Sequence, residues 1–367
     1  MKVLVTGGGT GGHIYPALAI ARKIKMEHKD ADILYVGTEN GLEAEIVPKE
    51  GLKFKPIRVR GFSRKLSKET IKSIKELFLG LNDAKKVIND YKPDIVIGTG
   101  GYVCGPIVLT AALKKIPTMI HEQNAFPGVT NRILSRFVDK IAGSFEESKK
   151  YFKDSNKLVI TGNPIRQDII GFNKKIAYKD LNIDSNKPFL LSFGGSGGQK
   201  KLNDAMLDVI IDNNNNKNIQ IIHVTGKRLY DSFMKELREK GVENLIGNIR
   251  VYPYLFEVPK ALSIADLIIT SGGAIAIAEL TAVGIPSILI PKAYTTENHQ
   301  EYNARALEKK GASIVILEKD LNGELLNREI ISLLSDKRKL SDMAIRSKRM
   351  GITNADERII NIVKELI

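Results

Sequence analysis

The chain has 367 residues, of which 43% are hydrophobic and 27% are charged, a balance typical of globular proteins. Because domains usually hold about 50 to 250 residues, this length predicts two of them. The single cysteine, Cys104, excludes an intramolecular disulfide framework, and we expect it to be a small buried side chain. The excess of 56 Lys and Arg over 42 Asp and Glu residues gives a net charge of +14, which favours an anionic partner.

Nucleic acid, an acidic membrane surface and a phosphorylated substrate would each satisfy this charge. The absence of tryptophan, of zinc-finger spacing and of an arginine-rich arm argues against nucleic acid. The longest apolar region, 261–291, is interrupted by Asp266, Glu279 and Pro286, so we expect a strand, a helix and a strand there and no membrane span. Since Met1 leads directly into a predicted strand, we expect no signal peptide.

A glycine loop, Gly7-Gly-Gly-Thr-Gly-Gly-His13, joins the first predicted strand to the first predicted helix. The β-branched run Lys2–Thr6 is typical of a buried parallel strand, and Pro16 lies where a helix would begin. A helix N-terminus presents unpaired N–H groups and a partial positive charge, and glycines let the backbone approach a bulky anion. The loop therefore favours a phosphate site, although a tight turn without a ligand would need the same glycines.

The same loop fits a second interpretation. Gly7, Gly9 and Gly12 match the glycine pattern of dinucleotide-binding folds, and Glu39 follows the next predicted strand, where a ribose-binding acid could lie. His13 is not explained by that pattern, because nucleotide loops usually carry no titratable group at this position. It is therefore a candidate for substrate chemistry.

After a strand at 54–59, the spacing of apolar residues predicts a long amphipathic helix. Its apolar stripe comprises Ile71, Ile74, Leu77, Phe78, Leu81 and Ile88, with Lys72, Lys75, Lys85 and Lys86 interleaved, and Arg58, Arg60, Arg64, Lys65 and Lys68 come before it. The helix could simply pack on the sheet. Alternatively, part of the stripe and its lysine rim could lie on anionic lipid.

Two further polar segments follow strands of the same predicted sheet. Thr99-Gly-Gly-Tyr102 follows a strand at 95–98, and His121-Glu-Gln-Asn124 follows a strand at 118–120. In doubly wound sheets, ligands bind outside the carboxyl ends of the strands, so both segments converge on the edge that carries the first loop. The Asn124 amide can bind substrate hydroxyls, whereas His121 can simply orient its neighbours.

The strand–loop–helix pattern then restarts. A strand at 157–161 closes the first sheet, and Gly162-Asn-Pro-Ile-Arg166 begins a connection from which Arg166 either projects towards a cleft or pairs with Asp168. The second half has a strand at 189–193, a glycine loop at 194–199, and strands at 219–224, 249–252, 267–270, 287–290 and 313–317. We therefore predict α/β domains at 1–162 and 163–340, and a terminal helix, 341–367, that packs back on the first.

Within the second half, Ser271-Gly-Gly-Ala274 follows a strand and begins the helix that bears Glu279. A carboxylate there can accept both hydroxyls of a ribose diol, or it can be an ordinary residue of a helix face. Asn298-His-Gln-Glu301 also lies at the carboxyl end of a predicted strand.

These motifs occur in an order, and at spacings, that cover nearly the whole chain. Together the segments 7–13, 99–102, 121–124, 162–166, 194–196 and 299–300 resemble the MurG family of bacterial cell-wall glycosyltransferases. The resemblance implies a GT-B architecture, in which two Rossmann-like doubly wound parallel-sheet domains face each other across a cleft. It implies no cofactor and metal-independent, inverting transfer of N-acetylglucosamine from UDP-N-acetylglucosamine to the 4-hydroxyl of the N-acetylmuramyl unit of lipid I, giving lipid II. It also implies a peripheral position at the cytoplasmic side of the cell membrane.

The resemblance further implies which residues contact substrate. It places the nucleotide on the C-terminal domain and the lipid-linked acceptor on the N-terminal one. The implied contact residues are Thr10, Gly11, Gly12, Asn124, Arg166, Ser196, Leu255, Ala274, Ile275, Glu279 and Gln300. Among them, Glu279 resembles the ribose-binding acid, and the backbone of Leu255 matches the position that meets uracil. Two positions depart from the family pattern: Gly197 replaces a common glutamine, and Ser271 or Gly272 replaces an arginine.

Inverting transfer needs a base for the acceptor hydroxyl and stabilisation of the departing diphosphate. The histidines are scattered and Asp30-Ala-Asp32 precedes a strand, so the glycine loops are better candidates than a metal for holding the diphosphate. We expect His13 to be the base, because a helix N-terminus disfavours imidazolium, with Glu122 as the alternative.

Other functions that fit the residues are a nicotinamide-dependent oxidoreductase, a membrane-surface module, a diacylglycerol glycosyltransferase and a UDP-sugar epimerase.

Overall fold

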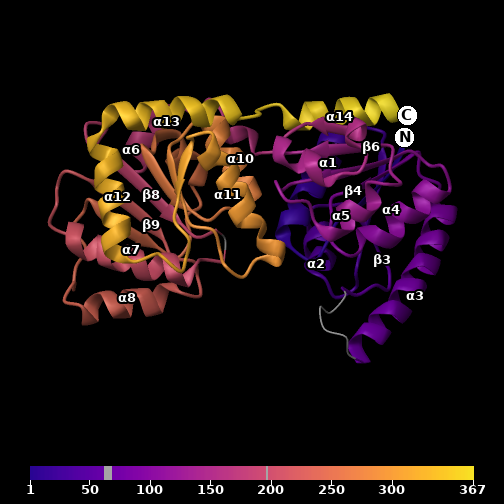
Figure 1. The fold of residues 1–367 in the computed structure, drawn as a ribbon, viewed down its shortest axis with the longest axis horizontal. Coiled ribbons are helices and arrows are strands. Elements are labelled where there is room, and N and C mark those ends of the chain that lie inside the picture. Colours follow the sequence, from indigo (N-terminus) through magenta and orange to yellow (C-terminus); the bar gives the residue numbers. More distant parts are fainter. Residues whose placement is uncertain (62–67, 196) are drawn as a thin grey trace. The chain divides into compact units, whose positions relative to one another are not determined.

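The computed structural model describes residues 1–61, 68–195 and 197–367 (Figure 1). The chain forms two compact units. The first combines Met1–Pro164 with Asn354–Ile367, and the second is Ile165–Thr353. No helix in the described part of the chain is both long enough and apolar enough to span a membrane.

The first unit is built on a seven-stranded parallel sheet with the order β3-β2-β1-β4-β5-β6-β7. Its strands are β1 (Lys2–Thr6), β2 (Asp32–Gly37), β3 (Lys53–Pro56), β4 (Ile95–Gly98), β5 (Thr118–Glu122), β6 (Lys140–Gly143) and β7 (Leu158–Ile160). The register pairs Thr6 with Gly98 and Gly98 with Ile120. The segments that follow β1, β4 and β5 therefore begin at the same edge of the sheet.

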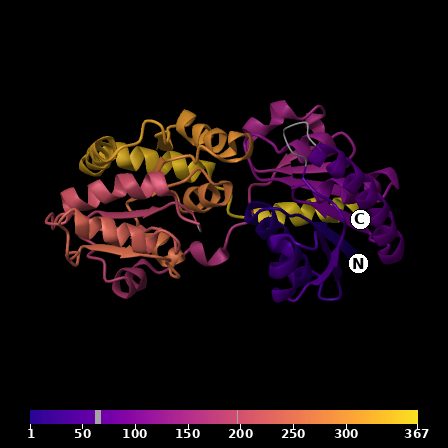
Figure 2. The ribbon, with the colours of Figure 1, turned by 90° about the horizontal axis from the view of Figure 1, so that it is seen from below.

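Helices cover both faces of this sheet. They are α1 (Gly11–Glu27), α2 (Leu42–Lys49), α3 (Lys68–Tyr91), α4 (Cys104–Leu113), α5 (Val129–Leu134) and α14 (Ala355–Leu366), with short 3-10 turns η1 (Glu146–Tyr151) and η2 (Ser155–Lys157). Successive side chains of β1 point to opposite faces, so Val3 packs with α1 and α14 while Leu4 packs with α3 and α4. In Figure 2 the yellow helix α14 lies beside the indigo elements of this unit, and Ile359 and Ile360 are buried in its core.

The second unit repeats this plan with a six-stranded parallel sheet in the order β10-β9-β8-β11-β12-β13. Its strands are β8 (Phe189–Phe193), β9 (Gln220–Val224), β10 (Ile249–Tyr252), β11 (Leu267–Thr270), β12 (Ser287–Leu289) and β13 (Ser313–Val315). Phe193 pairs with Thr270, and Thr270 pairs with Leu289. The segments after β8, β11 and β12 therefore also share one edge.

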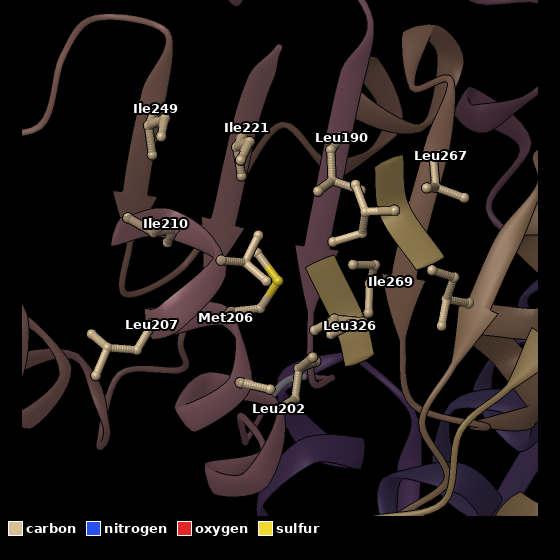
Figure 3. Packing of buried hydrophobic residues seen from close by; sticks show 14 of the residues in the cluster. Leu190, Leu202, Met206, Leu207, Ile210, Ile221, Ile249, Leu267, Ile269 and Leu326 are labelled. Atoms are coloured by element: carbon tan, nitrogen blue, oxygen red, sulfur yellow. The ribbon is translucent and has the colours of Figure 1, made fainter. Parts of the chain in front are cut away.

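The helices of the second unit are α6 (Lys174–Asp180), α7 (Lys200–Asn213), α8 (Tyr230–Glu239), α9 (Val258–Ile264), α10 (Ala274–Val283), α11 (His299–Lys309), α12 (Gly323–Ser335) and α13 (Lys337–Met350), with 3-10 turns η3 (Gln167–Ile169) and η4 (Thr296–Asn298). Figure 3 shows Met206 and Leu202 of α7 beneath Leu190 of β8 and Ile221 of β9. These side chains are fully buried, so they form a close-packed core that holds the strand ends in fixed positions.

The α/β class and the two doubly wound parallel sheets predicted from the sequence are confirmed. The apolar region 261–291 forms the end of α9, then β11, α10 and β12, as the interrupting charges indicated. The terminal region differs from the expected single helix: α13 packs against α10 in the second unit, and only α14 belongs to the first. The reason is Thr353 and its neighbours, which form an irregular segment between two separate helices.

Candidate active site

The first glycine loop connects β1 to α1, which begins at Gly11. Thr10 and Gly12 are exposed, and the Thr10 carbonyl accepts hydrogen bonds from the N–H groups of His13 (3.1 Å) and Ile14 (3.2 Å). The first N–H groups of a helix have no partner inside it. The loop therefore turns a set of backbone donors and the positive end of the α1 dipole towards solvent.

A buried carboxylate that sequence reasoning missed holds this loop in place. Glu43, in the first turn of α2, is 0% exposed, and its oxygens accept hydrogen bonds from the Gly9 N–H (3.2 Å), the Thr38 N–H (3.0 Å) and the Thr38 hydroxyl (2.7 Å). A Cβ on Gly8 would lie 2.6 Å from a Glu43 oxygen, and one on Gly41 would lie 2.3 Å from it. In the sequence it is an acidic residue two positions after Gly41, and nothing there marks it as a support for the loop.

The second glycine loop packs directly on the first. The Gly8 N–H donates to the Gly100 carbonyl (3.3 Å), and a Cβ on Gly101 would lie only 2.2 Å from the Gly8 carbonyl oxygen. Gly101 also has φ of +83°, a conformation that L side chains rarely adopt. The Thr99 hydroxyl donates to the His13 carbonyl (2.7 Å), which ties this loop to α1.

His13 is half-buried at the junction of the two loops. Its Nδ1 lies 3.0 Å from the Gly8 carbonyl, which can only accept a hydrogen bond, so we assign the proton of the neutral ring to Nδ1. Burial lowers the pKa of His13 below its usual value near 6.5, against the opposing effects of the Gly8 carbonyl and Glu43. The ring is therefore neutral at pH 7 and has its lone pair on Nε2.

The segment after β5 is organised by two buried side chains. The His121 Nε2 contacts the Gly162 carbonyl (3.1 Å), and burial lowers the pKa of His121 to about 4, so it is a neutral orienting group. Burial raises the pKa of Glu122, which is 1% exposed, and four hydrogen bonds oppose the shift. Its oxygens accept from the Asn124 N–H (2.9 Å), the Asn124 amide (3.1 Å), the Gly128 N–H (3.1 Å) and the Asn131 amide (2.8 Å).

Burial and these four donors argue against Glu122 as the catalytic base and favour His13 for that role. Glu122 instead holds the half-buried Asn124 at the edge of the sheet. The Gln123 amide donates to the Thr99 carbonyl (2.9 Å) and so connects this segment to the second glycine loop. Thr10, Gly11, Gly12, His13 and Asn124 thus belong to one hydrogen-bonded edge of the first unit.

Cys104 lies directly beneath this edge and is buried, as its residue type indicated. Its sulfur contacts the carbonyls of Thr6 (3.1 Å) and Gly100 (3.0 Å), and burial raises the pKa of the thiol to about 12. It is a packed, protonated thiol that lacks the thiolate character of a nucleophile.

In the second unit, a glycine loop follows β8 in the same way. A Cβ on Gly198, where φ is +74°, would lie 2.2 Å from the Thr225 carbonyl oxygen, so this position requires glycine. Ser196, one of the predicted contacts, lies outside the described residues. The neighbouring loop after β11 leads into α10, whose first residues are Ala274 and Ile275. The N-terminus of α10 therefore opens at the same sheet edge.

Glu279 of α10 forms an ion pair with Arg166. The Arg166 Nε donates to one carboxylate oxygen (3.0 Å), and the Glu279 side chain is 12% exposed, compared with 49% for Arg166. Arg166 therefore contacts Glu279, and the predicted pairing with Asp168 is not the one that forms. Burial raises the pKa of Glu279, and Arg166 opposes that shift. The pair therefore places a nearly buried carboxylate next to a half-exposed cation at α10.

Gln300, in the first turn of α11, contacts the loop after β12 and the loop after β11. Its side-chain oxygen accepts from the Lys292 N–H (3.0 Å), and a Cβ on Gly272 would lie 2.2 Å from its carbonyl oxygen. Leu255 follows β10, the edge strand of this sheet, and is half-buried, and the exposed rings of its neighbours Tyr254 and Phe256 contact each other. Within the described residues, no group of three His, Cys, Asp or Glu side chains could hold a metal ion.

Comparison with known proteins assigns each half of the chain to a domain family. Residues 3–143 match the model of the glycosyltransferase family 28 N-terminal domain, and residues 189–359 match that of the family 28 C-terminal domain. A relative from Acetivibrio thermocellus is 52% identical over 100% of this chain and 98% of its own length. One from Finegoldia magna is 51% identical over 100% of this chain and 98% of its own. Both are named UDP-N-acetylglucosamine–N-acetylmuramyl-(pentapeptide) pyrophosphoryl-undecaprenol N-acetylglucosamine transferase.

Solved structures agree with this assignment. The crystal structure of Acinetobacter baumannii MurG is 27% identical, covers 99% of each chain and superposes with a TM-score of 0.80. A UDP-GlcNAc 2-epimerase from Neisseria meningitidis, 16% identical with a TM-score of 0.67 over 100% of each chain, shares the fold alone. The chain therefore belongs to glycosyltransferase family 28, and within it to the family of the UDP-N-acetylglucosamine–N-acetylmuramyl-(pentapeptide) pyrophosphoryl-undecaprenol N-acetylglucosamine transferases.

Proposed function

We propose that this protein transfers N-acetylglucosamine from UDP-N-acetylglucosamine to the 4-hydroxyl of the N-acetylmuramyl unit of lipid I, with inversion and without a metal, giving lipid II. The observation that carries the proposal is the full-length match to transferases of that name, at 52% identity in one case. The glycine loops that precede helices in both units agree with it, because each can bind a phosphorylated group. Membership of this family argues against the oxidoreductase alternative.

The donor is proposed to bind the second unit. There Glu279 accepts the ribose hydroxyls, Ala274 and Ile275 at the N-terminus of α10 lie along the diphosphate, and the Leu255 backbone meets uracil. Gln300, Arg166 and Ser196 complete the proposed donor contacts, with Ser196 outside the described residues. The acceptor is proposed to bind Thr10, Gly11, Gly12 and Asn124 of the first unit.

The proposed chemistry begins at His13. Its neutral Nε2 takes the proton of the acceptor 4-hydroxyl as that oxygen attacks the anomeric carbon of the sugar. The bond from this carbon to the β-phosphate oxygen breaks, and its electron pair leaves with UDP. Helix N-termini and loop N–H groups stabilise the charge that develops on the departing diphosphate.

To test the proposal, the purified protein is incubated with labelled UDP-N-acetylglucosamine, a short-chain lipid I analogue and EDTA. We expect UDP release and a labelled disaccharide product in equal amounts. Release of UDP without disaccharide would contradict the acceptor assignment and favour a diacylglycerol acceptor or an epimerase. Activity that appears only after a divalent metal is restored would contradict metal independence.

We predict that His13→Ala loses at least ~10²-fold in turnover, the usual scale for a general base, while the affinity for UDP stays within about twofold. His28→Ala is a matched control, because His28 is an exposed histidine at the other end of α1. Single-turnover rates and UDP titration measure the two quantities. A loss below tenfold for His13→Ala would remove it from the role of base.

The pH dependence gives a second check on His13. Its lowered pKa means that the neutral, active form persists as the pH falls below 6.5. The acid limb of kcat/KM should therefore have its midpoint below pH 6.5, and this limb should vanish in His13→Ala. A midpoint above pH 6.5 would contradict a buried, neutral base.

We predict that Glu279→Gln weakens UDP binding roughly tenfold to a hundredfold, the scale expected for hydrogen bonds to a charged group. The wild type should prefer UDP to 2′-deoxy-UDP, and the variant should lose most of this preference. Glu239→Gln is the control, since Glu239 is an exposed glutamate at the C-terminal end of α8. An undiminished preference in Glu279→Gln would exclude Glu279 from contact with the ribose.

The first unit is also proposed to dock on the cytoplasmic face of the membrane, as a peripheral protein. Phe78 of α3 is 67% exposed beside the exposed Lys75, whereas Ile88 further along the helix is 2% exposed. The predicted stripe thus divides into a core part and an exposed part. The side chains of Ile71 and Ile74 lie outside the described residues. The guanidinium group of Arg58, from the basic segment before α3, already forms two hydrogen bonds with Asp83, at 2.8 and 2.6 Å.

We predict that Phe78→Asp weakens binding to phosphatidylglycerol vesicles at least tenfold, because it replaces an inserted ring by a charge that the anionic surface repels. Ile331→Asp on α12 of the second unit, where the side chain is 53% exposed, is the matched control. Vesicle sedimentation measures binding, and circular dichroism checks the fold. Unchanged binding of Phe78→Asp would assign α3 to packing alone.

A further inference from the structure

Lys292 brings a cation to the glycine loops of the second unit. It follows β12 after Ile290 and Pro291, and its Nζ donates to the Gly198 carbonyl at 2.8 Å. The same nitrogen lies 4.0 Å from the position that a Cβ on Gly195 would occupy, and the Ser271 hydroxyl oxygen lies 3.7 Å from that position. The ammonium group and the hydroxyl thus face one small space above the loop that follows β8.

Glu318 acts on this ammonium group electrostatically, from beyond the reach of an ion pair. Within residues 1–61, 68–195 and 197–367, no carboxylate forms an ion pair with Lys292 within 4.0 Å. The nearby Glu318 accepts hydrogen bonds from the Gln199 amide (2.8 Å) and the Ala293 N–H (3.0 Å). Burial lowers the pKa of Lys292, and Glu318 opposes the shift. A half-buried cation that is held by a carbonyl needs an anion to offset its desolvation.

We propose that the Lys292 ammonium binds the diphosphate of the nucleotide-sugar donor in the space between Gly195 and Ser271. This inference rests on the proposed function and adds a residue that sequence reasoning did not identify. The lysine lies at the carboxyl end of β12, and the two loops that it faces follow β8 and β11. The three strands are aligned at this edge by their register, so the cation and the loop N–H groups can meet one anion.

The charge of Lys292 then contributes to the departure of UDP. As the bond between the anomeric carbon and the β-phosphate oxygen breaks, negative charge grows on that phosphate. A fixed ammonium group stabilises this charge without giving up its proton. Lys292 would therefore lower both the dissociation constant for UDP and the barrier to transfer.

The experiment compares UDP with uridine as ligands, by calorimetry, for the wild type, Lys292→Met and Lys292→Arg. Methionine keeps much of the side-chain length and removes the charge, and arginine keeps the charge. We expect Lys292→Met to weaken UDP binding at least tenfold and to leave uridine binding within twofold, with most of the UDP affinity kept in Lys292→Arg. Lys201→Met, which removes an exposed charge from the first turn of α7, should leave both affinities unchanged.

Two results with the Lys292→Met variant would overturn the inference. Unchanged UDP binding in Lys292→Met would show that the ammonium does not reach the diphosphate. Equal weakening of UDP and uridine would show that Lys292 only supports the loop through Gly198. A wild type that binds UDP but transfers no sugar would overturn the transferase proposal and leave this inference standing, whereas one that binds no UDP would overturn both.

Discussion

The two units depend on the same constraint, which is the close approach of backbone to backbone at the carboxyl ends of parallel strands. A Cβ would come within 2.2 Å of a carbonyl oxygen at Gly101 in the first unit and at Gly198 and Gly272 in the second. At these contacts the loops are packed as tightly as the main chain allows. Because glycines let the backbone approach this closely, the helix N-termini at these strand ends can lie near a phosphorylated ligand.

Tight loops of this kind need an internal framework, and buried carboxylates supply it in the first unit. Glu43 accepts from the backbone of Gly9 and Thr38, and Glu122 accepts from the backbone of Asn124 and Gly128. Each carboxylate is nearly inaccessible, so its hydrogen bonds are not exchanged for water and the loops are fixed before any ligand arrives. Such preorganisation reduces the entropy lost on binding and aims donors at the charge that develops during transfer.

The strand–loop–helix units and the position of His13 could be predicted from the sequence because their signals are local. The glycine run, the apolar strand before it and the histidine after it are neighbours in the chain. The contacts of Glu43 and Lys292 and the Arg166–Glu279 pair could not be predicted in this way, because their partners lie on other elements. The local sequence around Glu122 suggests a possible base, whereas its burial and four donors, which come only with the fold, favour a structural role.

The net charge of +14 affects the binding of anionic partners in a different way from the local contacts in the loops. Many surface cations are paired, such as Arg58 with Asp83 and Lys260 with Asp180, so they add little to specific recognition. The summed field of the excess positive charge instead raises the rate at which an anionic ligand or surface is encountered, and salt screens it within about 8 to 10 Å. A contact made by Lys292 should be screened less, because its side chain is half-buried. Raising the salt concentration should therefore slow association more than it speeds dissociation.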